Sequence, residues 1–369
     1  MKTGLLGGTL AVSPRSDREE ARDMLYAGLD LSRKRLDFEL LAGDGERVLA
    51  GACPPDADGL AGLAERLGGL GEPISAAIES MNGARFVHDR LEEAGWRVEI
   101  ADALKVKGLA PLACKTDRID AHVLAELARR DLVPALWLPD PAVRAERERA
   151  RFRLHLVRQR TRLKARIHAT LLAFGHPCPV SDLFGARGRA LLAGLALPEP
   201  WAGNVRASLQ LIDQLDAQTE ALERELRRLG AEHPYVALLT SMPGVAWILG
   251  YTIAAEIGDI GRFSAPRKLV GYTGLTPRVM QSGERDRRGP LTKNGPRYLR
   301  WAYIEAAQHA CRYPPYHDLY VRTKRRLGRN RGAKVAAITV ARRLAEATWW
   351  MLTRNQPFAP AGAAPVLAA

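Results

Sequence analysis

Residues 115–121 read Lys-Thr-Asp-Arg-Ile-Asp-Ala, and small or apolar residues recur every few positions in the stretch that follows. These residues are Ala121, Leu124, Ala125, Leu127 and Ala128. Their spacing predicts a helix, with Asp117 and Asp120 three residues apart on one face of its first turn. Neighbouring carboxylates repel each other unless a cation lies between them, and Mg²⁺ with oxygen ligands suits that role. The same pair is also typical of a solvated acidic turn that complements the helix dipole. The residues upstream are needed to choose between a metal site and a solvated turn.

Upstream of this helix, the hydrophobic pattern predicts strands and helices in the order βββαβαβα. The expected strands are 24–32, 35–42, 46–53, 73–80 and 96–101, and the expected helices are 56–70, 84–94 and the one beginning near Asp117. This α/β order implies a mixed sheet with helices packed on it. Two further carboxylates occupy notable places, because Asp30 lies in the first strand and Glu79 ends the fourth.

This combination of strand order and acidic residues resembles the RNase H-like fold in its RuvC-like form. In that fold the ends of the central strands converge on a late helix. The resemblance therefore implies that Asp30, Glu79, Asp117 and Asp120 form a metal-binding tetrad. Such a site suits two Mg²⁺ ions about 4 Å apart, which clamp the attacking and leaving oxygens of a phosphodiester.

The charge of the chain points to a polyanionic partner. Its 369 residues contain 55 Lys and Arg against 41 Asp and Glu, a net charge of +14, and nucleic acid is the first candidate. The four cysteines form no C-x-x-C pair and the eight histidines no H-E-x-x-H, so neither a zinc module nor a disulfide framework is indicated. This cysteine usage fits a reducing cytoplasm. No run of 18 apolar residues occurs, so we expect no segment that spans a membrane.

Two long helices are expected in the middle of the chain, at 144–174 and 205–229, with an irregular segment at 175–203 between them. Their apolar residues recur at three- and four-residue steps, so they pair in coiled-coil fashion, either with each other or with a second copy of the chain. Arginines are expected over much of the remaining surface of the first helix. That face is either solvated or suited to RNA phosphates, with Arg158, Arg162 and Arg166 as candidate contacts.

The C-terminal region is expected to be mostly helical. Two apolar helices flank Met242-Pro243-Gly244-Val245, which resembles a helix-hairpin-helix element whose backbone at Gly244 grips a phosphate, although an ordinary helical corner fits equally. A basic loop then surrounds Ser282, a helix is expected from Arg297 to Tyr313, and a second basic loop is expected at 323–334 before a last helix at 335–352. Further nucleic-acid contacts are predicted at Arg285, Arg287, Arg288, Lys293, Arg297, Lys324, Arg325 and Arg326.

Taken together, these motifs resemble the DEDD-type transposases of the IS110 insertion-sequence family, from about Leu25 to Leu352. The motifs are Gly28-Leu29-Asp30, Glu79-Ser80, Lys115-Thr116-Asp117-x-x-Asp120-Ala121, Pro243-Gly244-Val245, Ala255-Glu256-Ile257-Gly258-Asp259, Phe263, Gly274-Leu275-Thr276-Pro277, Ser282-Gly283 and Lys293-x-Gly295. The resemblance implies site-specific recombination guided by a structured noncoding bridge RNA that pairs with donor and target double-stranded DNA.

The resemblance also implies roles for particular residues. The tetrad binds metal, and a C-terminal serine, here Ser282, is the nucleophile. Gln281 stands where many members have another serine, and Glu284 where many have a second glycine. Because recombination handles several strands at once, we expect a homodimer or a homotetramer.

The expected domains are a disordered leader at 1–23, a RuvC-like domain at 24–140, a helical coiled-coil region at 141–232, a C-terminal transposase domain at 233–356 and a disordered tail at 357–369. The main alternative is a Mg²⁺-dependent structure-specific nuclease of the junction-resolvase kind, which forms no covalent intermediate. An actin-like ATPase is a further alternative, because Gly28-Leu29-Asp30-Leu31-Ser32 resembles a phosphate loop. A catalytically dead nucleic-acid-binding relative is the last.

Overall fold

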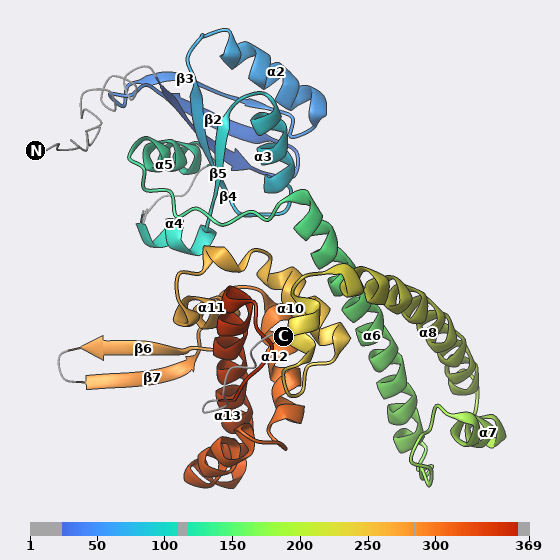
Figure 1. Ribbon diagram of the computed structural model, residues 1–369. Coiled ribbons are helices and arrows are strands. Elements are labelled where there is room, and N and C mark those ends of the chain that lie inside the picture. The colour runs from blue at the N-terminus through green and yellow to red at the C-terminus, as the bar shows by residue number, and fades with distance from the viewer. Residues whose placement is uncertain (1–23, 110–116, 283–284, 361–369) are drawn as a thin grey trace, which may run out of the picture. The chain divides into compact units, whose positions relative to one another are not determined.

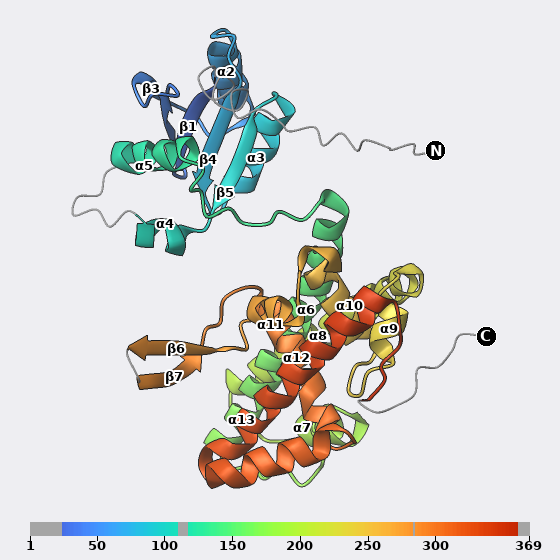
Figure 2. The same ribbon diagram turned by 60° about the vertical axis from the view of Figure 1, so that its left-hand side comes forward.

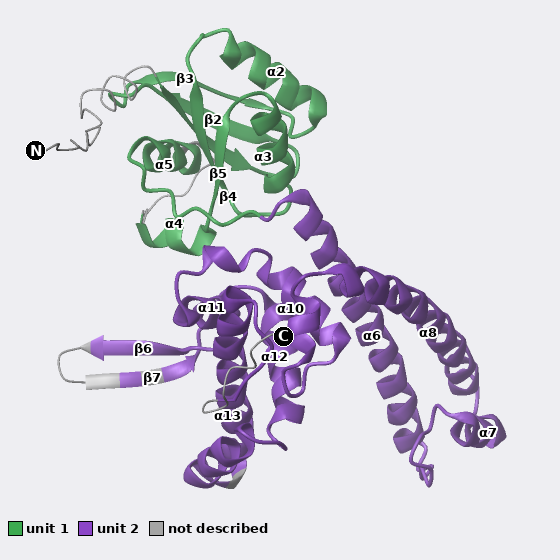
Figure 3. Ribbon diagram, in the orientation of Figure 1, with its two compact units in different colours: residues 1–138 green, residues 139–369 purple. Residues whose placement is uncertain are grey.

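The computed structural model of the chain describes residues 24–109, 117–282 and 285–360 (Figure 1). The side chains of residues 117, 118, 282, 285, 286, 288 and 329 also lie outside the described part. The expected leader at 1–23 is outside it too, as is most of the expected tail. The chain divides into two compact units, residues 1–138 and 139–369 (Figure 3).

Unit 1 is built on one five-stranded sheet. Its strands are β1 (Leu25–Leu31), β2 (Leu36–Leu41), β3 (Arg47–Cys53), β4 (Ile74–Glu79) and β5 (Arg97–Ala101), in the spatial order β3-β2-β1-β4-β5. β1, β2 and β3 pair antiparallel, whereas β4 runs parallel to both β1 and β5. The predicted meander followed by alternating helices and strands is therefore confirmed as a mixed sheet.

Helices cover both faces of this sheet. α2 (Ala57–Gly68) and α3 (Ala84–Glu93) bury one face, and α5 (Asp117–Arg129) covers the other. Alternation along the strands explains the division, because Leu25, Ala27 and Leu29 of β1 all enter the core beneath α2 and α3. A short helix that was not predicted, α4 (Ala103–Leu109), follows β5.

Unit 2 begins with two long helices, α6 (Pro141–Ala173) and α8 (Trp201–Glu232), packed against each other as a hairpin. Their far ends share a small core with α7 (Ala186–Gly194). The prediction that 175–203 is irregular is therefore wrong over α7. Pro177, Pro179, Pro198 and Pro200 bracket a short sequence that is still long enough for two helical turns.

The rest of unit 2 surrounds one large apolar core. Its helices are α9 (Val236–Thr240), α10 (Trp247–Ile257), η1 (Ile260–Arg262), α11 (Pro266–Thr273), α12 (Arg297–Ala310) and α13 (Tyr316–Arg354), and its strands are β6 (Pro277–Ser282) and β7 (Arg285–Leu291). The chain remains packed as far as Phe358, whose N–H donates to the Ser241 hydroxyl at 2.8 Å. No helix in the described residues is long and apolar enough to cross a membrane.

Two basic loops expected in this region have regular structure instead. Ser282 ends a strand of an antiparallel hairpin, and the segment 323–334 lies within α13, which bends at Gly328 (φ 75°). Figure 2 shows the hairpin extending away from the helices of its unit and two differently directed segments of α13. Charge alone does not define a loop, since Lys and Arg are good helix formers.

Candidate active site

One face of the sheet in unit 1 carries two of the predicted acidic residues. In the parallel pairing of β1 with β4 the last matched residues are Leu29 and Ile78, and Asp30 and Glu79 come next on their strands. Because side chains alternate along a strand, both carboxylates project to the face opposite the Leu29 core. Both residues are half-buried.

Helix α5 packs on that same face at Gly28. A Cβ on Gly28 would lie 1.8 Å from the carbonyl oxygen of Ala121 and 2.4 Å from the amide nitrogen of Ala125. Near the other end of α5, the Arg129 guanidinium donates to the carbonyl of Gly43 at 3.3 Å, beyond the end of β2 that pairs with the start of β1. Helix α5 therefore runs antiparallel to β1, with its first turn over the end of β1.

The helix start and the strand end consequently lie at the same edge. Asp117 begins α5, roughly 6 Å along the helix axis from Ala121, while Asp30 is roughly 7 Å along β1 from Gly28 in the same direction. Asp120 is half-buried on this first turn. The first turn of α5, with Asp120 and the backbone of residue 117, thus lies at the edge of the sheet where β1 and β4 end, whereas the Asp117 side chain lies outside the described residues.

The donors at this edge are chemically suited to a hard cation. They are carboxylates, the ligands that Mg²⁺ prefers in proteins. Among the described side chains, which include Asp30, Glu79 and Asp120 but not Asp117, no three or more His, Cys, Asp and Glu form a group that could hold a metal ion. The donor set fits Mg²⁺ in kind, and the predicted tetrad as a whole stays a prediction.

Two buried acids on this face were missed at the level of sequence. Asp37 lies directly opposite Asp30 in the pairing of β2 with β1, and Glu39 lies opposite Gly28. Asp37 accepts from Nε of Arg35 at 3.0 and 2.9 Å and from Nη2 at 2.7 Å, while Glu39 is 2.9 Å from Nδ1 of His122 on α5. The alternation Leu36-Asp37-Phe38-Glu39-Leu40 was the signal that could have found them, because it places two acids on one face of a strand.

In unit 2 the predicted nucleophile lies on a hairpin with a closely packed base. Ser282 is the last residue of β6 and pairs with Arg285 of β7. At the base, a Cβ on Gly274 (φ 68°) would lie 2.2 Å from the Asn294 carbonyl oxygen. A Cβ on Gly295 (φ 73°) would lie 2.0 Å from a carbonyl oxygen as well, that of Tyr272. Both glycines are needed because the two chain segments approach backbone to backbone.

Hydrogen bonds join the same two segments. The Lys293 N–H donates to the Gly274 carbonyl at 3.1 Å, and Nη1 of Arg300 donates to the carbonyls of Thr273 and Asn294 at 3.2 and 3.4 Å. Burial lowers the pKa of the Arg300 guanidinium. A two-stranded hairpin is marginal by itself, so these contacts at its base orient the arm that carries Ser282.

Much of the predicted basic face of α6 is paired with groups of unit 2 itself. Arg147 is buried and donates to the carbonyls of Ala255 and Glu256 at 2.8 and 2.6 Å, so the expectation that the arginines of this helix lie on its surface is wrong for Arg147. Arg149 and Arg153 pair with Glu225 and Glu223 of α8 at 3.0 and 2.6 Å. Arg160 likewise pairs with Asp216. Arg149, Arg153 and Arg160 therefore join α6 to α8, which supplies the opposite charges. The sequence of α6 alone does not reveal these partners.

Arg151 binds the fully buried Glu256, with Nε and Nη2 at 2.6 and 2.8 Å from its carboxylate oxygens. Burial opposes the charge of Arg151 most strongly, but the hydrogen bonds to Glu256 and the attraction of its negative charge together outweigh burial and raise the pKa of the guanidinium. Three guanidinium groups lie over the ring of Tyr298. The Cζ atoms of Arg151, Arg158 and Arg297 are 5.1, 5.6 and 4.9 Å from the ring centroid. Two predicted nucleic-acid contacts, Arg158 and Arg297, therefore meet at one tyrosine.

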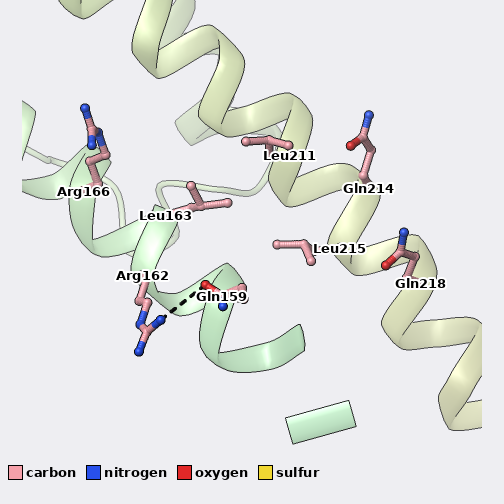
Figure 4. Close-up of a pocket in the computed structure, with 8 residues that line it drawn as sticks. All are labelled: Gln159, Arg162, Leu163, Arg166, Leu211, Gln214, Leu215 and Gln218. Atoms are coloured by element: carbon pink, nitrogen blue, oxygen red, sulfur yellow. Dashed lines mark hydrogen bonds between the residues drawn. The ribbon is translucent and has the colours of Figure 1, made fainter. Parts of the chain in front are cut away.

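Arg162 and Arg166 lie farther along α6 and are exposed. Together with Gln159, Gln214 and Gln218 they line a hollow of about 580 Å³ between α6 and α8 (Figure 4). Leucines of both helices form its floor, so this is an open part of the helical seam with a polar rim.

The remaining predicted contacts lie on several elements. Arg287 on β7, Lys293 after it, and Lys324, Arg325 and Arg326 on α13 are exposed, whereas the side chains of Arg285 and Arg288 lie outside the described residues. Gly244 (φ 80°) has a packing role, because a Cβ there would lie 2.2 Å from the carbonyl oxygen of Ala306 in α12. The two-helix corner exists, and a phosphate contact at Gly244 stays a prediction.

Comparison with known proteins gives matches over both units. Residues 27–176 match the DEDD family model of the IS110 type, described as "Transposase", and residues 236–322 match the model described as "Transposase IS116/IS110/IS902 family". The chain is 28% identical over 300 residues to the transposase for insertion sequence element IS1328 of Yersinia enterocolitica, covering 78% of this chain and 86% of that protein. A probable family 20 transposase of Pseudomonas aeruginosa is 27% identical over 299 residues, with the same coverage of 78% and 86%. The putative transposase y4qE of Sinorhizobium fredii is 31% identical over 201 residues, covering 54% and 49%.

Proposed function

Because the chain belongs to the IS116/IS110/IS902 family of insertion-sequence transposases, we propose that it cuts and rejoins DNA through a phosphoserine intermediate at Ser282. As a transposase it is an enzyme that acts on DNA. The observation that carries the proposal is the hairpin, which presents Ser282 at the end of β6 on an arm fixed at its base by Gly274, Gly295 and Arg300.

The proposed chemistry conserves the energy of the DNA backbone. The Ser282 hydroxyl loses its proton and attacks the scissile phosphorus, a P–Oγ bond forms, and the bond to the 3′ oxygen breaks. That oxygen takes up a proton and leaves as a 3′-hydroxyl. A 3′-hydroxyl of the exchanged strand then loses its proton and attacks the phosphoserine, the P–Oγ bond breaks, and the Ser282 oxygen regains a proton, so rejoining needs no ATP.

For unit 1 we propose an RNase H-like domain of the RuvC-like form. The order β3-β2-β1-β4-β5 and the carboxylates at the end of β1, at the end of β4 and on the first turn of α5 support it. Asp30, Glu79, Asp117 and Asp120 would hold Mg²⁺, which when bound supplies charge stabilisation to a pentacovalent phosphate. The exposed Arg287 pairs with Met280, two residues before Ser282, and adds positive charge near the proposed nucleophile.

We further propose that a structured noncoding bridge RNA guides the enzyme to donor and target DNA, and that it works as a homodimer or homotetramer in the cytoplasm. The net charge of +14 and the exposed cations of α6 and α13 support two polyanionic partners. Protein purified from cells that carry the whole element should retain one defined RNA, and removal of that RNA should abolish DNA cutting.

A denaturing gel tests the phosphoserine directly. With labelled DNA spanning an element end, its guide RNA and Mg²⁺, the wild-type protein should form a protein–DNA adduct that survives denaturation. Ser282→Ala should form none, and Asp30→Asn should form far less, whereas Ser264→Ala removes an exposed hydroxyl elsewhere in unit 2 and should behave as wild type. Cut DNA without any adduct, or an adduct in Ser282→Ala, would overturn the serine mechanism, and the first result would establish the metal-dependent nuclease instead.

A further inference from the structure

A basic hollow lies between α12 and the first segment of α13, away from the hairpin base. It has a volume of about 750 Å³ and is lined by residues of both helices. Gln308 and Cys311 line it on one side, and His317, Tyr320, Lys324 and Arg325 on the other, with Arg312 between them. The proposed DNA chemistry assigns no role to this space.

The bend in α13 holds the hollow in shape. Gly328 has φ 75° and ψ −176°, so the helix direction changes there, and the second segment folds back on the first. A Cβ on Gly332 would lie 2.5 Å from the carbonyl oxygen of Lys324, which means that the two segments touch at the residue lining the hollow. The backbone of Lys324 is therefore supported by direct contact with the second segment of α13.

The charge of the hollow is of one sign. Arg312, Lys324 and Arg325 are exposed, and no carboxylate is among its lining residues. Within the described residues, none of these three cations has an ion pair with a carboxylate. From Tyr316 to Lys334 the sequence has seven Lys and Arg and a single acid, Asp318. Such a field concentrates phosphate groups.

The hollow also offers groups that phosphate does not need. Gln308 is exposed and carries both a donor and an acceptor, and Tyr320 supplies an aromatic ring. Nδ1 of His317 lies 3.3 Å from the Cys311 carbonyl oxygen, which only accepts, so Nδ1 is the donor in this contact and Nε2 is left for another partner. Amide and imidazole groups beside an aromatic ring are the usual means of holding an unpaired base.

The geometry points to a seat for one unpaired nucleotide of a nucleic-acid strand, with its phosphate on Arg312, Lys324 and Arg325 and its base toward Gln308, His317 and Tyr320. A pocket of several hundred Å³ fits a nucleotide, whereas a lone phosphate would leave most of it empty. A continuous duplex keeps its bases stacked inside, so the ligand is a bulged or extruded nucleotide of RNA or DNA. This inference rests on the proposed binding of nucleic acid, but not on Ser282 or the acidic residues.

Binding of the full-length protein to matched hairpins tests it. The probes are an RNA hairpin with a single-nucleotide bulge, the same RNA hairpin without the bulge, and the two corresponding DNA hairpins. Wild type should bind a bulged probe roughly ten- to hundredfold more tightly than its continuous partner, the range expected for one stacked base. The RNA and DNA arms identify the strand that supplies the nucleotide.

Two pairs of variants locate the effect. Gln308→Trp fills the hollow without changing its charge and should abolish the preference for the bulge, while His309→Trp, on the next exposed position of α12 and outside the lining, should retain it. Arg312→Gln/Lys324→Gln should weaken both probes and reduce the slope of log affinity against log salt by about two. Arg267→Gln/Lys268→Gln removes two exposed cations of α11 and should keep the bulge preference.

Equal affinity of wild type for bulged and continuous probes in both arms would overturn the inference, and so would a bulge preference that survives Gln308→Trp. Thermal unfolding of each variant shows whether it is folded, and the double substitution changes surface residues only. Because the readout is binding, it remains informative if Ser282→Ala proves to cut DNA, and an absent bulge preference leaves the adduct experiment unaffected.

Discussion

Asp30 and Asp37 stand directly opposite each other in the antiparallel pairing of β1 and β2, so the two carboxylates share one face of the sheet. Asp37 is 5% exposed and is held by three contacts from the guanidinium of Arg35. Arg35 thereby compensates a buried negative charge next to a proposed metal ligand.

Arg35→Gln should therefore destabilise unit 1 by about 1–3 kcal/mol, the usual cost of leaving a buried polar group without its partner. Arg35→Gln/Asp37→Asn should recover most of that loss, because the charge that needed compensation is gone. Urea unfolding curves measure both. Arg90→Gln, which breaks the exposed pair with Glu93, is the control and should change stability by less than about 1 kcal/mol. A double variant as unstable as Arg35→Gln would contradict this reading.

Gly28→Ala should displace α5 from the sheet. The added methyl group would lie 1.8 Å from the Ala121 carbonyl oxygen, and this backbone cannot give way without moving the first turn of α5. We expect a loss of about 3 kcal/mol or more in unfolding free energy together with a loss of DNA cutting.

The control for that substitution is Gly62→Ala in α2, where a Cβ meets nothing within 4 Å. It should raise stability by about 0.5–1 kcal/mol, because alanine suits an exposed helix better than glycine. Unfolding curves compare the two variants. A Gly28→Ala protein with wild-type stability and activity would show that α5 can move away from β1 without loss, which would contradict this prediction.

Glu256→Gln should be the most damaging single change of a charge in unit 2. The Glu256 side chain is fully buried and binds Arg151, so neutralising it leaves the Arg151 guanidinium without its counter-charge. A loss of about 3–5 kcal/mol is expected. Glu220→Gln removes an exposed partner of Arg224 on α8 and should cost about 0.5 kcal/mol. Thermal unfolding distinguishes them, and equal effects would mean that the buried pair contributes no more than the exposed one.

The strands and helices of unit 1 were predictable because their hydrophobic periods are regular and their turns are short. Strand and helix ends from Leu25 to Ala101 fall within two residues of the prediction. The shared edge of Asp30 and Glu79 also follows from the sequence, since parallel strands that begin together end together. The compensation of Asp37 by Arg35 did not follow, because strand alternation identifies a face but not the partner of a side chain.

Unit 2 was harder to predict from sequence for a physical reason. Arg147 and Arg151 look like surface charges on an arginine-rich helix, and only the tertiary structure shows that the C-terminal end of α10 binds both. The segment around Ser282 was predicted as a loop because its two strands lack the apolar alternation of a buried sheet. Its structure depends instead on the close backbone contacts of Gly274 and Gly295, which flank the hairpin. Periodicity describes cores well and describes such backbone contacts poorly.

Gly274→Ala should release the hairpin from its base. The residue has φ 68°, and its Cβ would lie 2.2 Å from the Asn294 carbonyl oxygen and 2.6 Å from Nη1 of Arg300. The left-handed conformation and the overpacking together should cost about 2–4 kcal/mol locally. Proteolysis between Pro277 and Leu291 should accelerate, and adduct formation at Ser282 should fall sharply while nucleic-acid binding through α13 persists. Gly271→Ala, in α11 with nothing within 4 Å of its Cβ, should leave both unchanged. If Gly274→Ala instead kept full adduct formation, orientation of the arm by its base would not be what presents Ser282 to DNA.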